Sequence, residues 1–136
     1  MNLLMAGRIA QSGLLAQRVR INVAATNLAN AQVTRTLEGG PYRAKNVVLK
    51  AVPLLKDQPL FQQVKVEAIK DDPSPFREVY DPGHPDADER GIVRYPNVDV
   101  ITEMVELLSA SRAYEANLSV LSTTKSMVLR SLDLLK

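Results

Sequence analysis

The stretch from residue 98 to residue 135, VDVITEMVELLSASRAYEANLSVLSTTKSMVLRSLDLL, decides the fold because it lacks proline and repeats one pattern throughout. Positions spaced alternately by four and three are mostly apolar, as in the a and d positions of a coiled coil. They are Val100, Met104, Leu107, Ser111, Tyr114, Leu118, Leu121, Lys125, Val128, Leu132 and Leu135. The pattern predicts a helix of roughly 57 Å, with Asn97 or Asp99 as its N-cap.

A second apolar stripe on the same segment predicts a second packing face. It comprises Ile101, Val105 and Leu108, then Val120, Met127 and Leu134. Tyr114 and Lys125 also lie on the first stripe. They either fill a gap and extend to an exposed edge, or contact neighbouring subunits.

Residues 3–30 predict a matching helix at the other end of the chain. One stripe runs through Met5, Ile9, Ser12, Ala16, Val19, Val23 and Thr26, and another through Leu3, Gly7, Ala10, Leu14, Gln17, Ile21, Ala24 and Leu28. Small residues on both stripes allow close approach of neighbours. Because glycine costs about 1 kcal/mol in a helix interior, this helix depends on packing partners.

All eight prolines lie between Pro41 and Pro96, so the middle of the chain is not helical. Residues 64–70 alternate apolar and polar side chains, which predicts a strand. Weaker strand patterns occupy 42–52, 76–80 and 91–95, and the sequence does not define a fold for 52–75. We expect three segments, 1–36, 37–96 and 97–136. The expected fold is mainly α, with two terminal helices in an antiparallel coiled-coil hairpin and a small β or loop insert.

The composition excludes several classes of function. The net charge is +2 and no basic run reaches four residues, so nucleic acid is not an expected partner. There is no cysteine, which excludes disulfide frameworks and thiol catalysis. No apolar run approaches the roughly 20 residues of a membrane span, and the N-terminus does not resemble a cleaved signal peptide. Direct membrane insertion is therefore not expected.

Two groups of side chains are candidates for chemistry. The only histidine, His84, lies near Asp81, Asp86, Asp88 and Glu89, which suggests either a metal site or, as we favour, a solvated turn. Glu103 and Glu106 lie one turn apart at a helix start, where acids complement the helix dipole. No phosphate-binding glycine motif is present. We therefore expect no catalytic site, no metal site and no cofactor.

The asparagines Asn22, Asn27 and Asn30 stand among alanines and valines near the end of the first helix. They are either exposed, with Asn30 near a helix cap, or they fix register through hydrogen bonds between helices. The residues alone favour exposure, whereas the family resemblance favours the interpretation that these asparagines fix register.

Several motifs resemble flagellar rod and hook proteins. Residues 12–31, and above all Ala25-Thr26-Asn27-Leu28-Ala29-Asn30, resemble the N-terminal signature of that family. The stretches 39–45, 81–91, 95–99, 103–105, 109–117, 125–127 and 132–133 are similar to a short proximal rod member of it. The resemblance covers nearly the whole chain except about 52–75.

The resemblance implies a structural subunit of the proximal rod, not an enzyme. Members of the family are exported uncleaved by the flagellar type III apparatus and assemble in the periplasm. Their terminal helices form a tube that transmits torque around the export channel. The implied partners are further copies, other rod proteins of the FlgB, FlgF and FliE types, and the export apparatus.

We expect the helix-packing and subunit contacts to lie along the two stripes. The candidate residues are Ile9, Leu14, Ala16, Val19, Ile21, Val23, Asn27, Leu28, Asn30, Met104, Leu107, Ser111, Tyr114, Leu118, Leu121, Lys125, Val128 and Leu132. One stripe of each helix would form the hairpin, and the spare stripes would face neighbours. Two alternatives stay open: a cytoplasmic coiled-coil adaptor or export chaperone, and a cell-wall enzyme that uses Glu103 and Glu106.

Overall fold

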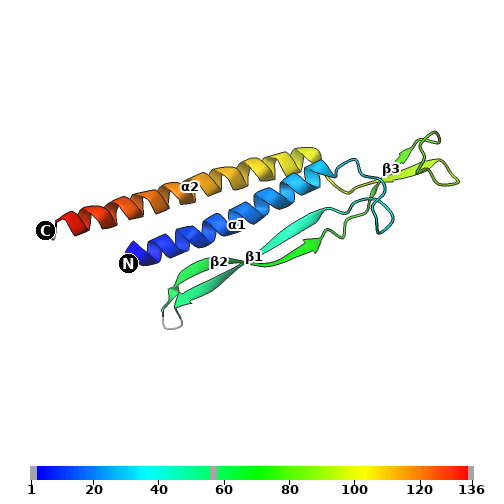
Figure 1. Ribbon diagram of the computed structural model, residues 1–136. Helices are drawn as coiled ribbons and strands as arrows, with labels where there is room; N and C mark the ends of the chain where they lie inside the picture. Colours follow the sequence, from blue (N-terminus) through cyan, green and yellow to red (C-terminus); the bar gives the residue numbers. More distant parts are fainter. Residues whose placement is uncertain (1–2, 56–57, 135–136) are drawn as a thin grey trace.

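Two long helices lie side by side, a β-hairpin follows the first of them, and a second, smaller hairpin projects from one end (Figure 1). The computed structural model describes residues 3–55 and 58–134. The elements are α1 (Leu3–Ala29), β1 (Lys45–Leu55), β2 (Gln58–Asp71), β3 (Arg77–Tyr80), β4 (Ile92–Tyr95) and α2 (Val100–Asp133). The ends of α1 and α2 nearest the chain termini lie at the same end of the molecule (Figure 1).

Helix α2 begins where the sequence predicts, because Asp99 caps it. Asp99 has extended backbone angles, φ −90° and ψ 107°. Its Oδ1 accepts hydrogen bonds from the amides of Ile101 at 3.0 Å and Thr102 at 3.4 Å. These amides have no partner inside the helix, so the aspartate satisfies them and sets the helix start. Of the two predicted caps, Asp99 is confirmed.

The two helices run antiparallel and approach closely. Gly7 lies near Thr124 of α2, and Gly13, further along α1, lies near Asn117. The residue numbers therefore decrease along α2 as they increase along α1. The buried residues of both helices are almost all small, which is what close backbone approach requires. They are Ala10, Gly13, Ala16, Ala24 and Asn27 on α1, and Ala110 on α2.

The predicted fold, a mainly α antiparallel coiled-coil hairpin with a small β or loop insert, is wrong. Residues 3–55 and 58–134 form two antiparallel sheets, β1–β2 and β3–β4, beside the two helices. The β1–β2 hairpin packs along α1, where its Val64 amide donates to the Ser12 hydroxyl at 3.1 Å. Ser12 belongs to one of the two predicted α1 stripes, and we expected a neighbouring subunit to cover whichever stripe did not meet the second helix. That stripe is instead partly covered by the chain's own hairpin, so the fold is a helix pair with a β layer.

The β1–β2 hairpin is much longer than the predicted strand 64–70. Its strands have 11 and 14 residues and pair antiparallel from Lys45 with Asp71. The register shifts between Val48 and Leu49 and again between Pro53 and Leu55. These irregularities and the prolines obscured the period-2 pattern. Within 52–75, where the sequence predicted a strand only at 64–70, residues 52–55 and 58–71 are strand, and residues 56–57 lie outside the described residues.

The smaller hairpin, β3–β4, ends the molecule opposite the chain termini (Figure 1). Val93 is fully buried and supplies its apolar centre. Gly91 has φ +75°, and a Cβ atom there would lie 3.0 Å from Pro82 Cβ and from the Tyr80 ring. Glycine at residue 91 thus permits both the left-handed backbone and the close approach.

Candidate functional site

The face of α2 that meets α1 is shifted by one residue from the predicted stripe at several positions. Glu103, Ala110, Asn117 and Thr124 contact or face α1, through hydrogen bonding, full burial or close approach. The corresponding predicted residues, one position later, were Met104, Ser111, Leu118 and Lys125. Among these Ser111 is half-buried and the other three are exposed. The helices therefore meet through small and polar residues, and large apolar side chains flank the contact.

The other predicted residues are half-buried or buried, except Leu132. On α2, Leu107, Tyr114, Leu121 and Val128 are half-buried, whereas Leu132 is exposed. On α1 and just beyond it, Ala16 and Asn27 are buried, and Ile9, Leu14, Val19, Ile21, Val23, Leu28 and Asn30 are half-buried. This placement locates the candidates within one chain.

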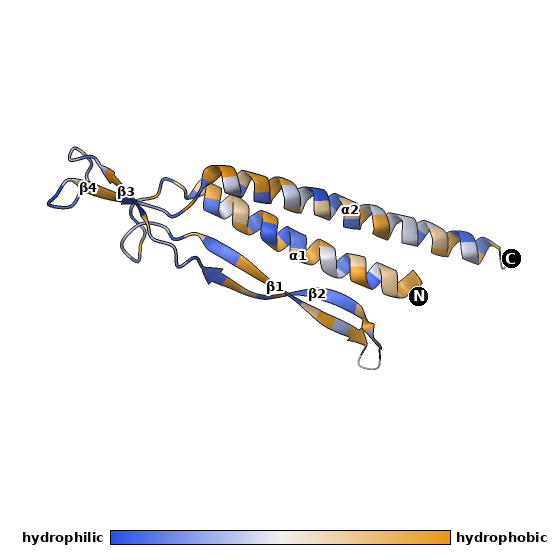
Figure 2. Ribbon diagram, turned by 180° about the vertical axis from the view of Figure 1, so that it is seen from behind, coloured by the Kyte–Doolittle hydropathy of each residue, from blue (hydrophilic) through white to orange (hydrophobic). Residues whose placement is uncertain are grey.

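A large apolar surface of α2 stays exposed. We call it the outer surface of α2, defined by Ile101, Met104, Val105, Leu108, Leu118, Val120, Met127, Leu129, Leu132 and Leu134. Exposure of these side chains ranges from 48% for Val120 to 87% for Leu134. Figure 2 shows apolar residues gathered especially at the α2 end nearest the small hairpin. Exposed apolar side chains gathered on one helix in this number indicate an interaction site.

Asn27 is the polar centre of the joint between the helices and the long hairpin. Its side chain is only 1% exposed and makes four hydrogen bonds. Nδ2 donates to the Lys45 carbonyl at 2.9 Å and to Glu103 Oε1 at 3.0 Å. Oδ1 accepts from the Tyr42 hydroxyl at 2.9 Å and from the Lys45 amide at 3.0 Å. One amide thus ties α1, α2 and the start of β1 together.

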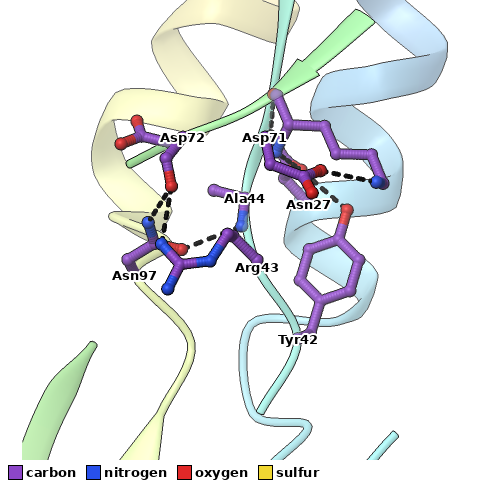
Figure 3. Close-up of polar contacts among 8 residues, drawn as sticks. Asn27, Tyr42, Arg43, Ala44, Asp71, Asp72 and Asn97 are labelled. Atoms are coloured by element: carbon purple, nitrogen blue, oxygen red, sulfur yellow. Dashed lines mark hydrogen bonds and ion pairs between the residues drawn. The ribbon is translucent and has the colours of Figure 1, made fainter. Parts of the chain in front are cut away.

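Asn97 holds the opposite side of the same joint. Figure 3 shows Asn27 and Asn97 on either side of the chain at Ala44. Asn97 Oδ1 accepts the Ala44 amide at 2.8 Å, and its Nδ2 donates to the carbonyls of Asp72 and Ser74 at 3.2 and 3.1 Å. Consecutive amides of residues 44 and 45 are therefore held by two asparagines, which sets the direction in which the hairpin leaves the helices.

Arg43 strengthens this side of the joint. Its guanidinium donates to the carbonyls of Asp72 and Ser74 at 2.7 and 2.9 Å, beside the Asn97 amide. The same group lies 4.2 Å from the centre of the Phe76 ring, a cation–π geometry. Arg43 therefore connects the two ends of the long hairpin with the segment that leads to β3.

The two glutamates at the start of α2 take part in structural contacts. Glu103 receives the Asn27 hydrogen bond, and burial raises its pKa above the ordinary glutamate value. Glu106 pairs with the Arg20 guanidinium, with nitrogen–oxygen distances of 2.6 and 2.7 Å. Burial also raises the pKa of the Tyr42 hydroxyl in the same joint. Both carboxylates bridge the helices, which accounts for their position without chemistry.

The loop around His84 is held by its own chain. His84 Nδ1 accepts the Asp86 amide at 3.0 Å. The Asp86 carboxylate accepts from the Thr34 hydroxyl and pairs with Arg35, both at 2.8 Å. Within residues 3–55 and 58–134, no group of three or more histidine or acidic side chains is placed to hold a metal ion.

Sequence reasoning found Asn27 but missed most of its partners. In the sequence, Tyr42, Arg43 and Lys45 stand out only as members of the family motif 39–45, and Asn97 only as a candidate N-cap of the second helix. The sequence does place Asn27 near the end of the first helix and Asn97 just before the second, with Tyr42 and the start of a strand between them. It could not be interpreted before the topology brought residues 27, 45 and 97 together.

No helix in the described part of the chain combines the length and the hydropathy that a membrane span needs.

Comparisons with known proteins agree with the motifs. The family model described as flagella basal body rod protein matches residues 8–35, and the model described as flagellar basal body rod FlgEFG protein C-terminal matches residues 89–134. A protein of Yersinia enterocolitica, flagellar basal-body rod protein FlgC, is 50% identical over 136 residues, or 98% of each chain. Proteins of the same name from Borreliella burgdorferi and Aquifex aeolicus are 41% and 42% identical. The Borreliella burgdorferi match covers 94% of both chains. The Aquifex aeolicus match covers 92% of this chain and 91% of the other. The chain therefore belongs to the FlgC family of flagellar basal-body rod proteins and is a structural component of the flagellar rod.

Proposed function

We propose that this chain assembles into the proximal rod by packing the outer surface of α2 against helices of neighbouring subunits. The carrying observation is the row of large apolar side chains on that helix, of which Met104, Val105 and Leu108 are 57%, 63% and 53% exposed. Exposure of these apolar side chains to water does not stabilise an isolated chain. Burial in an assembly would stabilise it by roughly 25 cal/mol for each Å² of apolar surface removed from water.

The proposed role is mechanical and non-catalytic. Subunits packed side by side through α2 would form a tube that transmits torque and encloses the export channel. The partners in this proposal are further copies, rod proteins of the FlgB, FlgF and FliE types, and the type III export apparatus. The proposed location is the periplasmic part of the basal body. The glutamates that a cell-wall hydrolase would need are already engaged by Asn27 and Arg20.

The test places the same charge on the proposed contact and at an exposed leucine away from α2. Leu118→Asp puts a carboxylate on a side chain that is 49% exposed on the outer surface of α2. Leu60→Asp makes the same change on β2, at a leucine that is 92% exposed. We expect Leu118→Asp to abolish swimming and rod assembly, and Leu60→Asp to leave both largely intact. Normal rods with Leu118→Asp would overturn the proposal.

Purified basal bodies separate this function from the adaptor alternative. A rod subunit is retained in them after the cytoplasm is washed away. A chain found only in the cytosolic fraction of wild-type cells would instead support the adaptor or chaperone.

A further inference from the structure

The loop between α1 and β1 displays a large apolar side chain that is fully exposed to solvent. Leu37 is 109% exposed, more than any other large hydrophobic residue in the described part of the chain. The loop is nevertheless ordered by its backbone: the Thr36 amide donates to the Gly40 carbonyl at 2.8 Å, and the Gly39 amide to the Thr36 carbonyl at 3.1 Å. Gly39 and Gly40 adopt φ +87° and +76°, which a tight turn of this kind requires. Leu37 is thus held out on a defined turn.

The next residue adds a negative charge to the same tip. Glu38 is exposed. Among the ion pairs of residues 3–55 and 58–134, none includes Glu38. The tip of the loop therefore presents one leucine and one carboxylate, both available to a partner.

The opposite end of the molecule carries a groove of matching chemistry. It lies between α1 and α2, has a volume of about 380 Å³, and is lined largely by Leu3, Gly7, Leu121, Thr124, Val128 and Leu129. Arg8 and Lys125 also line it, and both are exposed. Neither takes part in an ion pair within the described part of the chain. The groove is apolar between two cations.

Gly7 keeps this groove open. A Cβ atom at residue 7 would come within 3.8 Å of the Leu121 and Thr124 side chains, which is ordinary contact distance. Leu121 and Thr124 therefore leave room above the glycine that a larger α1 residue would occupy. The groove consequently depends on a residue that weakens the helix by itself.

We propose that the Leu37–Glu38 tip of one copy docks into the Gly7 groove of a second copy, with Leu37 between the helices and Glu38 beside Arg8 and Lys125. The tip follows α1 at the joint, and the groove lies at the end where the chain termini are (Figure 1). A copy therefore cannot fill its own groove. The contact uses two different surfaces, so repeating it joins copies head to tail in a ring or an open helix instead of a closed two-fold dimer.

This inference rests on the proposed function, because it specifies one contact between copies in the rod. It differs from the packing of the outer surface of α2, which joins copies side by side. The two contacts use separate residues, and they can fail separately.

Crosslinking tests the contact directly, because the chain contains no natural cysteine. Leu37→Cys and Thr124→Cys variants are mixed at high concentration and treated with a short bifunctional thiol reagent. We expect a crosslinked dimer, and a ladder of longer products when one chain carries both substitutions. The control pair is Leu37→Cys with Ser109→Cys, an exposed position on α2 roughly 22 Å along the helix from Thr124. Equal yields from the two pairs, or no product from either, would overturn the proposal.

A charge exchange gives a second, independent readout. Glu38→Arg should reduce the yield of the Leu37–Thr124 crosslink at least tenfold. Adding Arg8→Glu and Lys125→Glu to the partner should restore most of it, which a merely damaged loop would not allow. If crosslinking fails while rods with an intact α2 surface still assemble, the head-to-tail contact is wrong and the proposed function stands. If Leu118→Asp leaves rods intact while crosslinking succeeds, the reverse holds.

Discussion

Gly13 of α1 faces the side-chain amide of Asn117 of α2, so closely that a Cβ atom at residue 13 would lie 2.7 Å from Asn117 Oδ1. The Asn117 amide is itself held in place, because its Nδ2 donates to the Ala113 carbonyl at 2.8 Å. The helices can approach this closely only because residue 13 has no side chain. This contact sets the spacing of the pair midway along α1.

Two glycine-to-alanine substitutions on α1 should therefore have opposite effects. Gly13→Ala should destabilise the chain by about 1–3 kcal/mol, the usual cost of overpacking. Gly7→Ala should stabilise it by about 0.5–1 kcal/mol, because the new methyl group meets ordinary contacts and alanine favours the helix. Chemical denaturation followed by circular dichroism measures both changes. Gly13→Ala combined with Asn117→Ala should recover most of the loss, and no recovery would refute the assigned clash.

The buried amide of Asn27 should be indispensable to the joint. Asn27→Leu keeps a similar size but leaves Glu103, the Tyr42 hydroxyl and both backbone groups of Lys45 without their partner. We expect a loss of at least about 2 kcal/mol in the free energy of unfolding. Asn22→Leu is the matched control, because that side chain is exposed on the same helix, and it should change stability by less than about 0.5 kcal/mol. Equal effects of the two variants would show that the joint does not depend on the amide.

The ionisation of Glu103 should oppose folding at neutral pH. Burial raises its pKa in the folded chain, so the folded state holds this proton more tightly than the unfolded state. Stability from this group is therefore lost as pH rises from the unfolded pKa through the higher folded pKa, and it stays low above that window. Glu103→Gln retains an oxygen that accepts from Asn27 and removes the titration. The variant should be more stable than the wild type at pH 7, with the difference shrinking below about pH 4. Thermal melts at the two pH values measure this, and an advantage that persists unchanged in acid would contradict it.

Two leucines one turn apart on α2 should separate folding from assembly. Leu121 is half-buried against Gly7, so Leu121→Asp places a charge between the helices and should lower the unfolding midpoint of the isolated chain. Leu118 is exposed, so Leu118→Asp should change the free energy of unfolding by less than about 0.5 kcal/mol. Both should block rod assembly, the first through the fold and the second through the surface. A large loss of stability with Leu118→Asp would mean that it packs within the chain.

Hydrophobic periodicity and capping chemistry alone determined the two helices to within a few residues. Residues 3–30 and 98–135 were expected, and the helices are Leu3–Ala29 and Val100–Asp133, with Asp99 as the cap. These are local properties: a helix start depends on one side chain and the next few amides. The family motifs could likewise be identified from the sequence alone, because each of them is a short run of particular residue types.

Only the tertiary structure decided which face of each helix is covered and by what. Two stripes offset by one residue have the same alternating spacing of four and three. The sequence alone therefore cannot tell whether Ala110 and Asn117 or Ser111 and Leu118 face α1, because the choice depends on how closely the two backbones approach. The long hairpin covers the α1 stripe through contacts such as Val64 with Ser12, 52 residues apart in the chain. The Asn27 joint likewise needs residues 42, 45 and 103 to converge. Such contacts depend on topology, and no local pattern of residue types encodes them.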